Sequence, residues 1–399
     1  MENKTSKKGF FMGKINVYKA SLNRIEECLL KYDKYYVAFS GGKDSGIMLN
    51  LVLQIAKKHN KKIAVLVVDT EAHYDYTYTY LENTINENLE YIELFWVALP
   101  LTLDNTLSCF ANNWICWDEN LKSNWIREKS KFAISDYNYF DFYKYGMTFY
   151  DFISKFAEWY ADKKRLCCFV GLRAKESDKR MKMFLNSNFY IFKNTKHSVN
   201  SYPIFDWEIS DIWKYYYQEK KEYNKIYDLM QMAGLPFKEQ RVGQLFGNEQ
   251  KRFLSITRVI DHKVWVKMLY RVNGVDFTSR ITDSGTLRNI SKPKNKTWEE
   301  FALFICNTMP QKQKYLIKNR IQIIINSWKK RDYICIPDEA PKELEKEIKA
   351  ISWRLICKSL LKNDFNFNGY KVVFRKNTTQ DKIRAFRSIN NQENLFSIN

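Results

Sequence analysis

Histidine and paired cysteines are scarce in this chain. Its 399 residues include four His, and none of the eight cysteines belongs to a Cys-x-x-Cys pair. Structural zinc sites and iron-sulfur clusters are built from these residues at short spacings, so the sequence predicts neither kind of metal centre. The thiols are most simply free and buried, as expected in a reducing compartment.

Long apolar runs are also missing. No stretch approaches the roughly 20 residues that span a bilayer, and the first residues, MENKTSKKGFF, lack the apolar core of a signal peptide. We therefore expect a cytoplasmic protein with no membrane partner. Hydrophobic residues still make up 45% of the chain and aromatic residues 16%, which is enough for a large core over two or three domains.

Acidic residues are too few to balance the basic ones. The 65 Lys and Arg exceed the 45 Asp and Glu, which gives a formal net charge of +20. Such an excess favours a polyanionic partner, either DNA or RNA or a strongly anionic small substrate. A lysine-rich solvated surface without a specific partner explains it equally well.

Two common phosphate-binding motifs, GxxxxGK[ST] and GxGxxG, are absent. Instead, residues 40–45 read SGGKDS, between an apolar segment at 35–39 that predicts a buried strand and a helical pattern that extends to Ile55. Glycines allow positive φ and close approach of a ligand, and the amides at a helix start attract anions. An ordinary Gly-Gly turn is the alternative.

The SGGKDS turn offers several groups to phosphate oxygens. Hydroxyls, amides and one cation are supplied by Ser40, Gly41, Gly42, Lys43 and Ser45. Asp44 is expected to hold a Mg²⁺ ion that is carried on the phosphates.

Three further apolar segments, at 63–68, 91–97 and 166–170, predict strands of a parallel sheet covered on both faces. Asp69 and Thr70 follow the first of them, at the edge where open α/β sheets bind ligands. Both are candidates for contacts to adenine or ribose. Alternatively, Asp69 only caps the next helix.

The strand at 166–170 runs directly into a second charged motif, GLRAKES at 171–177, with Arg180 one turn later. A glycine at a strand end with arginines beyond it, here Gly171 and Arg173, predicts a second anion-binding edge that faces the SGGKDS turn. Glu176 is placed to orient one of the arginines. The alternative is a helix start with an internal ion pair.

Positioned cations neutralise the negative charge that develops on a leaving phosphate group. The candidate catalytic residues are therefore Lys43, Asp44, Arg173 and Arg180. Arg241, much later in the chain, is a further candidate for gripping the substrate.

Aromatic residues are dense between these motifs, with Trp114, Trp117 and Trp125 in one segment. They are expected either to line a substrate pocket or to form core, and the sequence leaves both open. A proline-led strand is expected around Pro203.

The composition becomes basic in the last quarter of the chain. Amphipathic patterns predict helices at 298–308, 315–328 and 343–361. The tail beyond them carries Lys371, Arg375, Lys376, Lys382, Arg384 and Arg387. A basic surface interleaved with aromatics suits nucleic-acid phosphates, and the alternative is a helical domain that only docks on the first one.

These patterns predict four segments. An N-terminal helix covers 1–30, an α/β nucleotide-binding domain 31–215, a helical continuation 216–290 and a basic helical domain 291–399.

The SGGKDS turn resembles the pyrophosphate loop of the ATP-pyrophosphatase (PP-loop) and phosphoadenylyl-sulfate (PAPS) reductase superfamily, and GLRAKES resembles its second nucleotide-site motif. This resemblance implies a Rossmann-like fold of the adenine nucleotide alpha hydrolase type that binds ATP or a related adenine nucleotide with Mg²⁺. The residues that it implies at the nucleotide are Ser40, Gly41, Gly42, Lys43, Asp44, Ser45, Asp69, Thr70, Gly171, Arg173 and Glu176.

Further segments, WICWD, TWEEFALFICNTMP and SWRLICKSLLKND, are similar to an IbrA-like group of PAPS reductase-like proteins with a C-terminal domain of unknown function. That group is described as co-activating prophage gene expression, often with a ParB-like partner protein. The resemblance therefore implies a regulatory role as one alternative, with the nucleotide site acting as a sensor.

One departure from the superfamily concerns sulfate reduction. PAPS reductases carry a nucleophilic cysteine in a C-terminal ECGLH-like motif, and no such motif occurs here. A sulfonucleotide reductase that uses another cysteine remains a second alternative. The leading hypothesis is an enzyme that cleaves ATP at the α-phosphate, adenylylates an acceptor and releases pyrophosphate.

Overall fold

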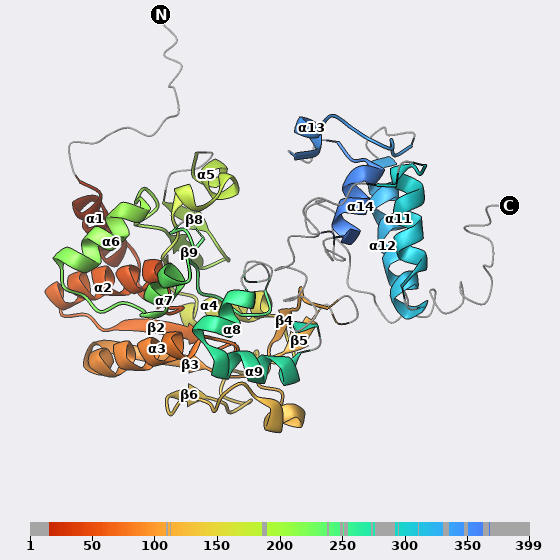
Figure 1. Cartoon of the computed structure of the whole chain (residues 1–399). Helices are drawn as coiled ribbons and strands as arrows, with labels where there is room; N and C mark the ends of the chain where they lie inside the picture. The colour runs from red at the N-terminus through yellow and green to blue at the C-terminus, as the bar shows by residue number, and fades with distance from the viewer. Residues whose placement is uncertain are drawn as a thin grey trace, which may run out of the picture. The chain divides into compact units, whose positions relative to one another are not determined.

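A computed structural model of the chain describes residues 16–108, 111, 113–185, 190–237, 239–247, 250, 254–272, 274–275, 292–293, 295–309, 311–329, 335–346, 350–361 and 367. The chain divides into two compact units, Met1–Ser284 and Gly285–Asn399 (Figure 1).

A seven-stranded sheet forms the centre of the first unit, in the order β6-β3-β2-β1-β7-β9-β8. Its strands are β1 (Lys34–Ala38), β2 (Ile63–Val68), β3 (Ile92–Val97), β6 (Ala133–Ile134), β7 (Leu166–Val170), β8 (Ile191–Lys193) and β9 (Ser198–Ser201). All neighbouring pairs are parallel except β8 and β9. A separate antiparallel ribbon joins β4 (Thr102–Asp104) to β5 (Asn113–Ile115).

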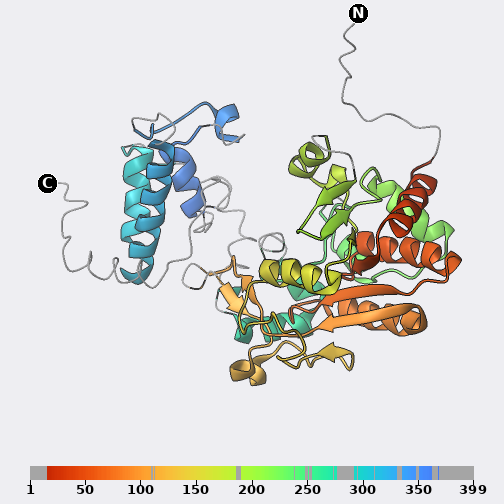
Figure 2. The same cartoon turned by 180° about the vertical axis from the view of Figure 1, so that it is seen from behind.

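Helices cover both faces of the sheet, because successive side chains of each strand point to opposite faces. On β1, Val37 packs with one buried cluster and Tyr36 with the other. The first face is covered by α1 (Val17–Lys31), α2 (Lys43–Lys58), α3 (Asp75–Asn88) and α6 (Ile209–Gln218). The second is covered by α4 (Phe149–Ala161), α7 (Ile226–Met232), α8 (Leu254–Ile260) and α9 (His262–Arg271). Figure 2, the view from behind, shows α4 lying along the sheet.

The remaining elements of the first unit are short. They are the 3-10 turns η1 (Leu89–Tyr91), η2 (Glu119–Asn124) and η3 (Ala174–Glu176), and the helix α5 (Asp178–Leu185). The η3 turn and α5 follow directly after β7 and carry the second charged motif.

The strand register decides where the two predicted anion-binding motifs lie. Ala38, the last residue of β1, pairs with Val170, the last residue of β7. The turns that follow the two strands therefore lie side by side at the carboxyl edge of the sheet. Strand order also reverses at β1, since β2 lies on one side of it and β7 on the other, and such switch points are where open α/β sheets bind ligands.

The predicted fold class is confirmed, with a mostly parallel sheet flanked by helices and a helical second unit. The strand expected around Pro203 is wrong in its position. β9 ends at Ser201 because proline has no N–H for the ladder. The Pro203 carbonyl instead accepts hydrogen bonds from Ser21 Oγ at 3.0 Å and Arg24 Nη1 at 2.7 Å in α1.

The second unit consists, in its described residues, of α11 (Trp298–Asn307), α12 (Gln311–Lys329), α13 (Lys342–Lys346) and α14 (Trp353–Leu361). The prediction of one helix over 343–361 is wrong. The segment contains two helices, and the Ser352 hydroxyl accepts the Leu355 amide at 3.2 Å where the second one starts. The basic tail from Lys371 to Arg387 lies outside the described residues.

Within the part of the chain that the structure describes, no helix combines the length and the apolar character needed to cross a membrane.

Candidate nucleotide site

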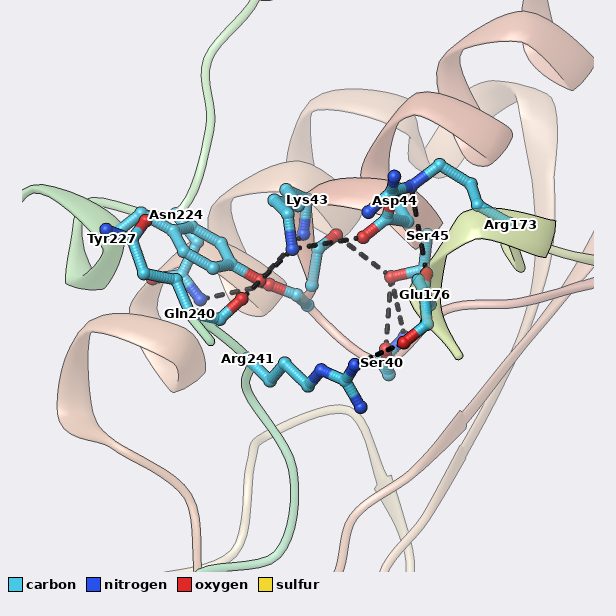
Figure 3. A network of polar contacts seen from close by, with 12 residues as sticks. Ser40, Lys43, Asp44, Ser45, Arg173, Glu176, Asn224, Tyr227, Gln240 and Arg241 are labelled. Carbon is cyan, nitrogen blue, oxygen red and sulfur yellow. Dashed lines mark hydrogen bonds and ion pairs between the residues drawn. The ribbon is translucent and has the colours of Figure 1, made fainter. Parts of the chain in front are cut away.

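The SGGKDS turn has the strand-to-helix geometry that the sequence predicts. Gly41 has a φ of +72°, a conformation that favours glycine, and Gly42 is the N-cap of α2. The turn is closed by its two serines, whose hydroxyl oxygens are 3.1 Å apart, and Ser45 Oγ donates to the Gly42 carbonyl at 3.0 Å (Figure 3). A buried side chain from later in the chain, Asn224, donates to the Gly41 carbonyl at 2.9 Å.

Gly171 brings the second motif into backbone contact with this turn. A Cβ atom at this position would lie 2.6 Å from the Asp44 carbonyl oxygen and 2.8 Å from the Ser45 nitrogen. Side chains cannot be accommodated at such distances. The two motifs are therefore in close backbone contact, and a shared anion site stays a prediction.

Asp44 lies between two cations of the site. Its carboxylate is 3.2 Å from Lys43 Nζ and accepts a hydrogen bond from Arg173 Nε (Figure 3). Burial alone would raise the pKa of Asp44, but the adjacent charges of Lys43 and Arg173 outweigh it and hold this pKa below its ordinary value. The carboxyl group is therefore ionised at neutral pH.

Glu176 gathers three arginines. Its carboxylate is ion-paired with Arg180 and lies 3.7 Å from Arg173 Nε, while its backbone carbonyl accepts a hydrogen bond from Arg241 Nη2 at 3.0 Å. The Glu176 carboxylate thus forms the internal ion pair of the alternative. Its role in orienting an arginine at a ligand stays a prediction.

Lys43 is buried at the floor of the site, with 4% of its surface exposed. Its ammonium group donates to the Gln240 carbonyl at 3.1 Å and lies 5.0 Å from the centre of the Tyr227 ring. Its backbone amide donates to the Tyr227 hydroxyl at 3.1 Å. Burial lowers the pKa of Lys43, although the Asp44 carboxylate acts in the opposite direction. Lys43 thus links the turn to the segment after α7.

These elements surround a cavity of about 680 Å³, which we call the cradle cavity. Its size is in the range of small-ligand sites, roughly 300–1,000 Å³. It is lined by Ser40, Gly42, Lys43, Asp44, Ser45, Gly171, Arg173, Ala174, Lys175, Glu176, Ser177, Asp178, Arg180, Met181, Glu208, Ile209, Tyr227, Phe237, Arg241 and Val242. The lining therefore includes both predicted motifs and Arg241.

Asp69 and Thr70 lie elsewhere, among buried groups beyond the end of β2. Asp69 is 1% exposed, and its carboxylate pairs with Arg127 Nη2 at 2.5 Å and accepts the Trp96 indole N–H at 3.0 Å. The Thr70 hydroxyl is 3.1 Å from Nε2 of buried His73. Neither predicted residue lines the cradle cavity.

The three tryptophans of the aromatic segment are core residues. Trp114, Trp117 and Trp125 are all buried, and none lines the cradle cavity. The Trp117 indole N–H donates to the Asp69 carbonyl at 2.6 Å, so this segment covers the end of β2 rather than a ligand.

Buried His73 makes stability depend on pH. Burial, and next the charge of Arg127, lower the pKa of His73 from 6.5 to about 4. As the pH falls, His73 of the unfolded chain takes up a proton before His73 of the folded chain does. The free energy of unfolding is therefore unaffected by His73 above pH 6.5, and it decreases between pH 6.5 and about pH 4, by about 3 kcal/mol at most. We expect His73→Gln to flatten this slope in urea unfolding at pH 7 and pH 5. Equal slopes in both proteins would contradict the assignment.

A Mg²⁺ ion that is carried on the phosphates and held by Asp44 stays a prediction. Both carboxylate oxygens of Asp44 already contact cations, and no group of three or more His, Cys, Asp or Glu side chains is placed to share a metal ion within the described ranges. We assign no step of the chemistry to a metal ion.

Apart from Arg241, sequence reasoning missed the contribution of residues 224–242. Asn224, Tyr227 and Gln240 each hold part of the SGGKDS turn, and Phe237 and Val242 line the cavity. Asn224 and Tyr227 belong to the segment YNKIYDLMQMAGLP at 223–236, which signals a helix and its end but carries no charge pattern that indicates a ligand.

A parallel sheet with a serine-glycine turn and clustered arginines at its switch point defines an adenine nucleotide alpha hydrolase-like domain. Residues 34–256 match the phosphoadenosine phosphosulfate reductase domain, and the chain belongs to that family. Residues 234–390 match a domain of unknown function, DUF3440, so the two matches overlap after α7.

A relative with the same extent is the uncharacterized protein YbdN of Escherichia coli (strain K12). It is 36% identical over 368 residues, which cover 88% of this chain and 89% of YbdN. The uncharacterized protein MJ0066 of Methanocaldococcus jannaschii is 31% identical over 194 residues, 48% of this chain and 33% of that protein.

Two solved structures show weaker similarity. The phosphoadenylyl-sulfate reductase of Candida auris, a phosphate complex, has a TM-score of 0.35 and 13% identity, and the match covers 60% of this chain and 98% of that one. The FMN adenylyltransferase of Candida glabrata, in complex with FMN and an ATP analogue, has a TM-score of 0.34 and 11% identity. That match covers 55% of this chain and 65% of the adenylyltransferase chain. The family assignment rests on the sequence matches.

Proposed function

We propose that the cradle cavity binds the polyphosphate of ATP or a related adenine nucleotide, and that the protein transfers the adenylyl group to an acceptor with release of pyrophosphate. The observation that carries this proposal is the backbone contact of two anion-binding motifs at the switch point of the sheet, enforced by Gly171. In this proposal the amides at the start of α2 face one side of the phosphates, and the guanidinium groups of the second motif face the other.

In the proposed reaction, a nucleophilic oxygen of the acceptor attacks the α-phosphorus. A bond forms there, the bond from the α-phosphorus to the oxygen bridging to the β-phosphorus breaks, and that oxygen leaves with the electron pair as part of pyrophosphate. The acceptor proton passes to solvent. Arg173 and Arg180 stabilise the leaving charge, so no protein nucleophile is needed.

Sulfonucleotide reduction is less well supported. No cysteine lines the cradle cavity among the described residues. Cys28, Cys116, Cys167, Cys168, Cys306 and Cys357 are buried, and the exposed Cys335 belongs to the second unit. A nucleophilic thiol would have to approach the nucleotide.

The acceptor is the open part of the proposal. We propose that the basic second unit presents it, as a nucleic acid or a partner protein such as a ParB-like protein. The decisive experiment incubates the chain with ATP labelled at the α- or γ-phosphate and with cellular RNA, DNA or protein. Transfer of α-label to a macromolecule, and of γ-label to pyrophosphate, supports the proposal.

Nucleotide binding without any turnover would instead favour the IbrA-like alternative, in which the site is a sensor. Sulfite release from PAPS would favour the reductase.

Arg173→Gln tests the electrostatic role directly. A hydrogen bond to a charged group contributes about 1.5–3 kcal/mol, so pyrophosphate release should slow by roughly ten- to a hundredfold. Arg165→Gln is the matched control, because the Arg165 side chain is 66% exposed and pairs with Asp33. Both residues precede β7 and β1, at the end of the strands opposite to the two motifs, and neither lines the cradle cavity. A loss below twofold for Arg173→Gln would contradict the proposed role.

A further inference from the structure

The described lining of the cradle cavity has a single exposed aromatic side chain, Phe237, which is 49% exposed. Its other aromatic residue, Tyr227, is buried and holds Lys43. A half-exposed ring leaves apolar surface in contact with water, and covering it with a planar apolar group is favourable.

The local sequence explains why the Phe237 side chain is exposed in the cavity lining. Helix α7 ends at Met232, and Gly234 follows with a φ of +81°, as is typical beyond a helix C-terminus. Pro236 then starts a turn in which its carbonyl accepts the Glu239 amide at 2.8 Å. Phe237 occupies the second position of this turn, with the Trp213 ring of α6 behind it at a centroid distance of 6.3 Å.

The segment that carries Phe237 is tied to the phosphate-facing part of the site. Three residues later, the Gln240 carbonyl accepts Lys43 Nζ at 3.1 Å, and Arg241 donates to the Glu176 carbonyl at 3.0 Å (Figure 3). Phe237 is therefore held at a fixed position relative to the SGGKDS turn.

The carboxyl edge of the sheet beyond β2 is filled by protein. Beyond β2, Asp69 and Thr70 are buried, and the Leu245 amide donates to the Ala72 carbonyl at 3.2 Å. Protein thus fills the place where the sequence predicted contacts to adenine or ribose. A ligand with its phosphates at the SGGKDS turn can reach Phe237 within the same cavity, because both line it.

We infer that the base of the bound nucleotide stacks on Phe237, while its polyphosphate reaches the SGGKDS turn. The inference rests on the proposed function and adds how the nucleoside end is held. Stacking on an aromatic face is tolerant of base identity, because every base has a π-face. Phe237 thus contributes affinity more than discrimination between purines.

The experiment compares two ligands in isothermal titration, a non-hydrolysable β,γ-methylene analogue of ATP and inorganic tripolyphosphate, which has no base. Stacking contributes about 1–3 kcal/mol per base, which corresponds to roughly 5- to 150-fold in Kd. Phe237→Ala should raise the Kd of the ATP analogue by this factor and should change the Kd of tripolyphosphate by less than about twofold. Phe237→Trp should restore affinity, and Tyr217→Ala, an 86% exposed aromatic outside the cavity, is the matched control.

An equal loss of affinity for both ligands in Phe237→Ala would overturn the inference, since the ring would then only support the structure of the phosphate site. Unchanged affinity for both ligands would also overturn it and would leave the proposed function intact. If the unaltered chain bound neither ligand, the proposed function itself would fail, which is a distinguishable result.

Discussion

Gly171→Ala is expected to lower nucleotide affinity and pyrophosphate release by about a hundredfold or more. The added methyl group would lie 2.6 Å from the Asp44 carbonyl oxygen and 2.8 Å from the Ser45 nitrogen, both backbone atoms that no rotamer change can move. The GLRAKES segment must then shift away from the SGGKDS turn. Displacement of about 1 Å in a site of this kind costs on the order of a hundredfold in rate.

Gly243→Ala is the matched control. It lies in the segment after α7 near the cavity-lining Arg241 and Val242, but a Cβ atom there would meet nothing within 4 Å. Titration with the ATP analogue and a pyrophosphate assay measure both variants, and circular dichroism checks that they remain folded. If folded Gly171→Ala bound nucleotide as the unaltered chain does, the two motifs would not act as one site.

The sequence predicted this part of the site well because its signals are local. A strand, a glycine turn and a helix are adjacent in the SGGKDS motif, and GLRAKES repeats that pattern after another strand. Parallel pairing of the two strands then brings the motifs together without further information. Arg173, Glu176 and Arg180 therefore line the same cavity as the SGGKDS turn, and their roles at a nucleotide stay predictions.

Asp69 shows where such reasoning fails. Its position after β2 predicts a ligand contact, but its neighbours come from distant parts of the chain. Arg127 neutralises the carboxylate, Trp96 and Trp117 cover it, and the segment with Leu245 closes the sheet edge above. Such long-range coverings have no local pattern. Phe237 is a similar case, because its local sequence does not indicate that it lines the cradle cavity.

Glu71 and Arg271 form a buried ion pair, and removing one partner alone should strongly destabilise the first unit. The Glu71 side chain is fully buried, and its carboxylate accepts Arg271 Nε at 2.6 Å and Nη2 at 2.9 Å. The Trp117 amide at 2.7 Å and the Ile126 amide at 3.2 Å complete its partners. The network is satisfied on all sides, so losing one partner leaves a buried charge uncompensated.

Arg271→Met is therefore expected to lower the free energy of unfolding of the first unit by about 3–5 kcal/mol in urea titrations. Arg165→Met, which breaks the exposed pair with Asp33, should cost less than about 1 kcal/mol. The double variant Glu71→Gln with Arg271→Met should recover part of the loss, because the unpaired charge is gone. A cost below 1 kcal/mol for Arg271→Met would show that the pair is dispensable.

The same pair also bears on where the nucleotide domain ends. Glu71 belongs to the phosphoadenosine phosphosulfate reductase match, which stops at residue 256, whereas Arg271 belongs to the DUF3440 match that begins at residue 234. A chain cut at 256 would lose α9 and the counter-ion of Glu71. We expect such a fragment to unfold at lower urea concentration than one cut at 284, and equal midpoints would contradict this. The start of the second family is thus structurally part of the nucleotide domain.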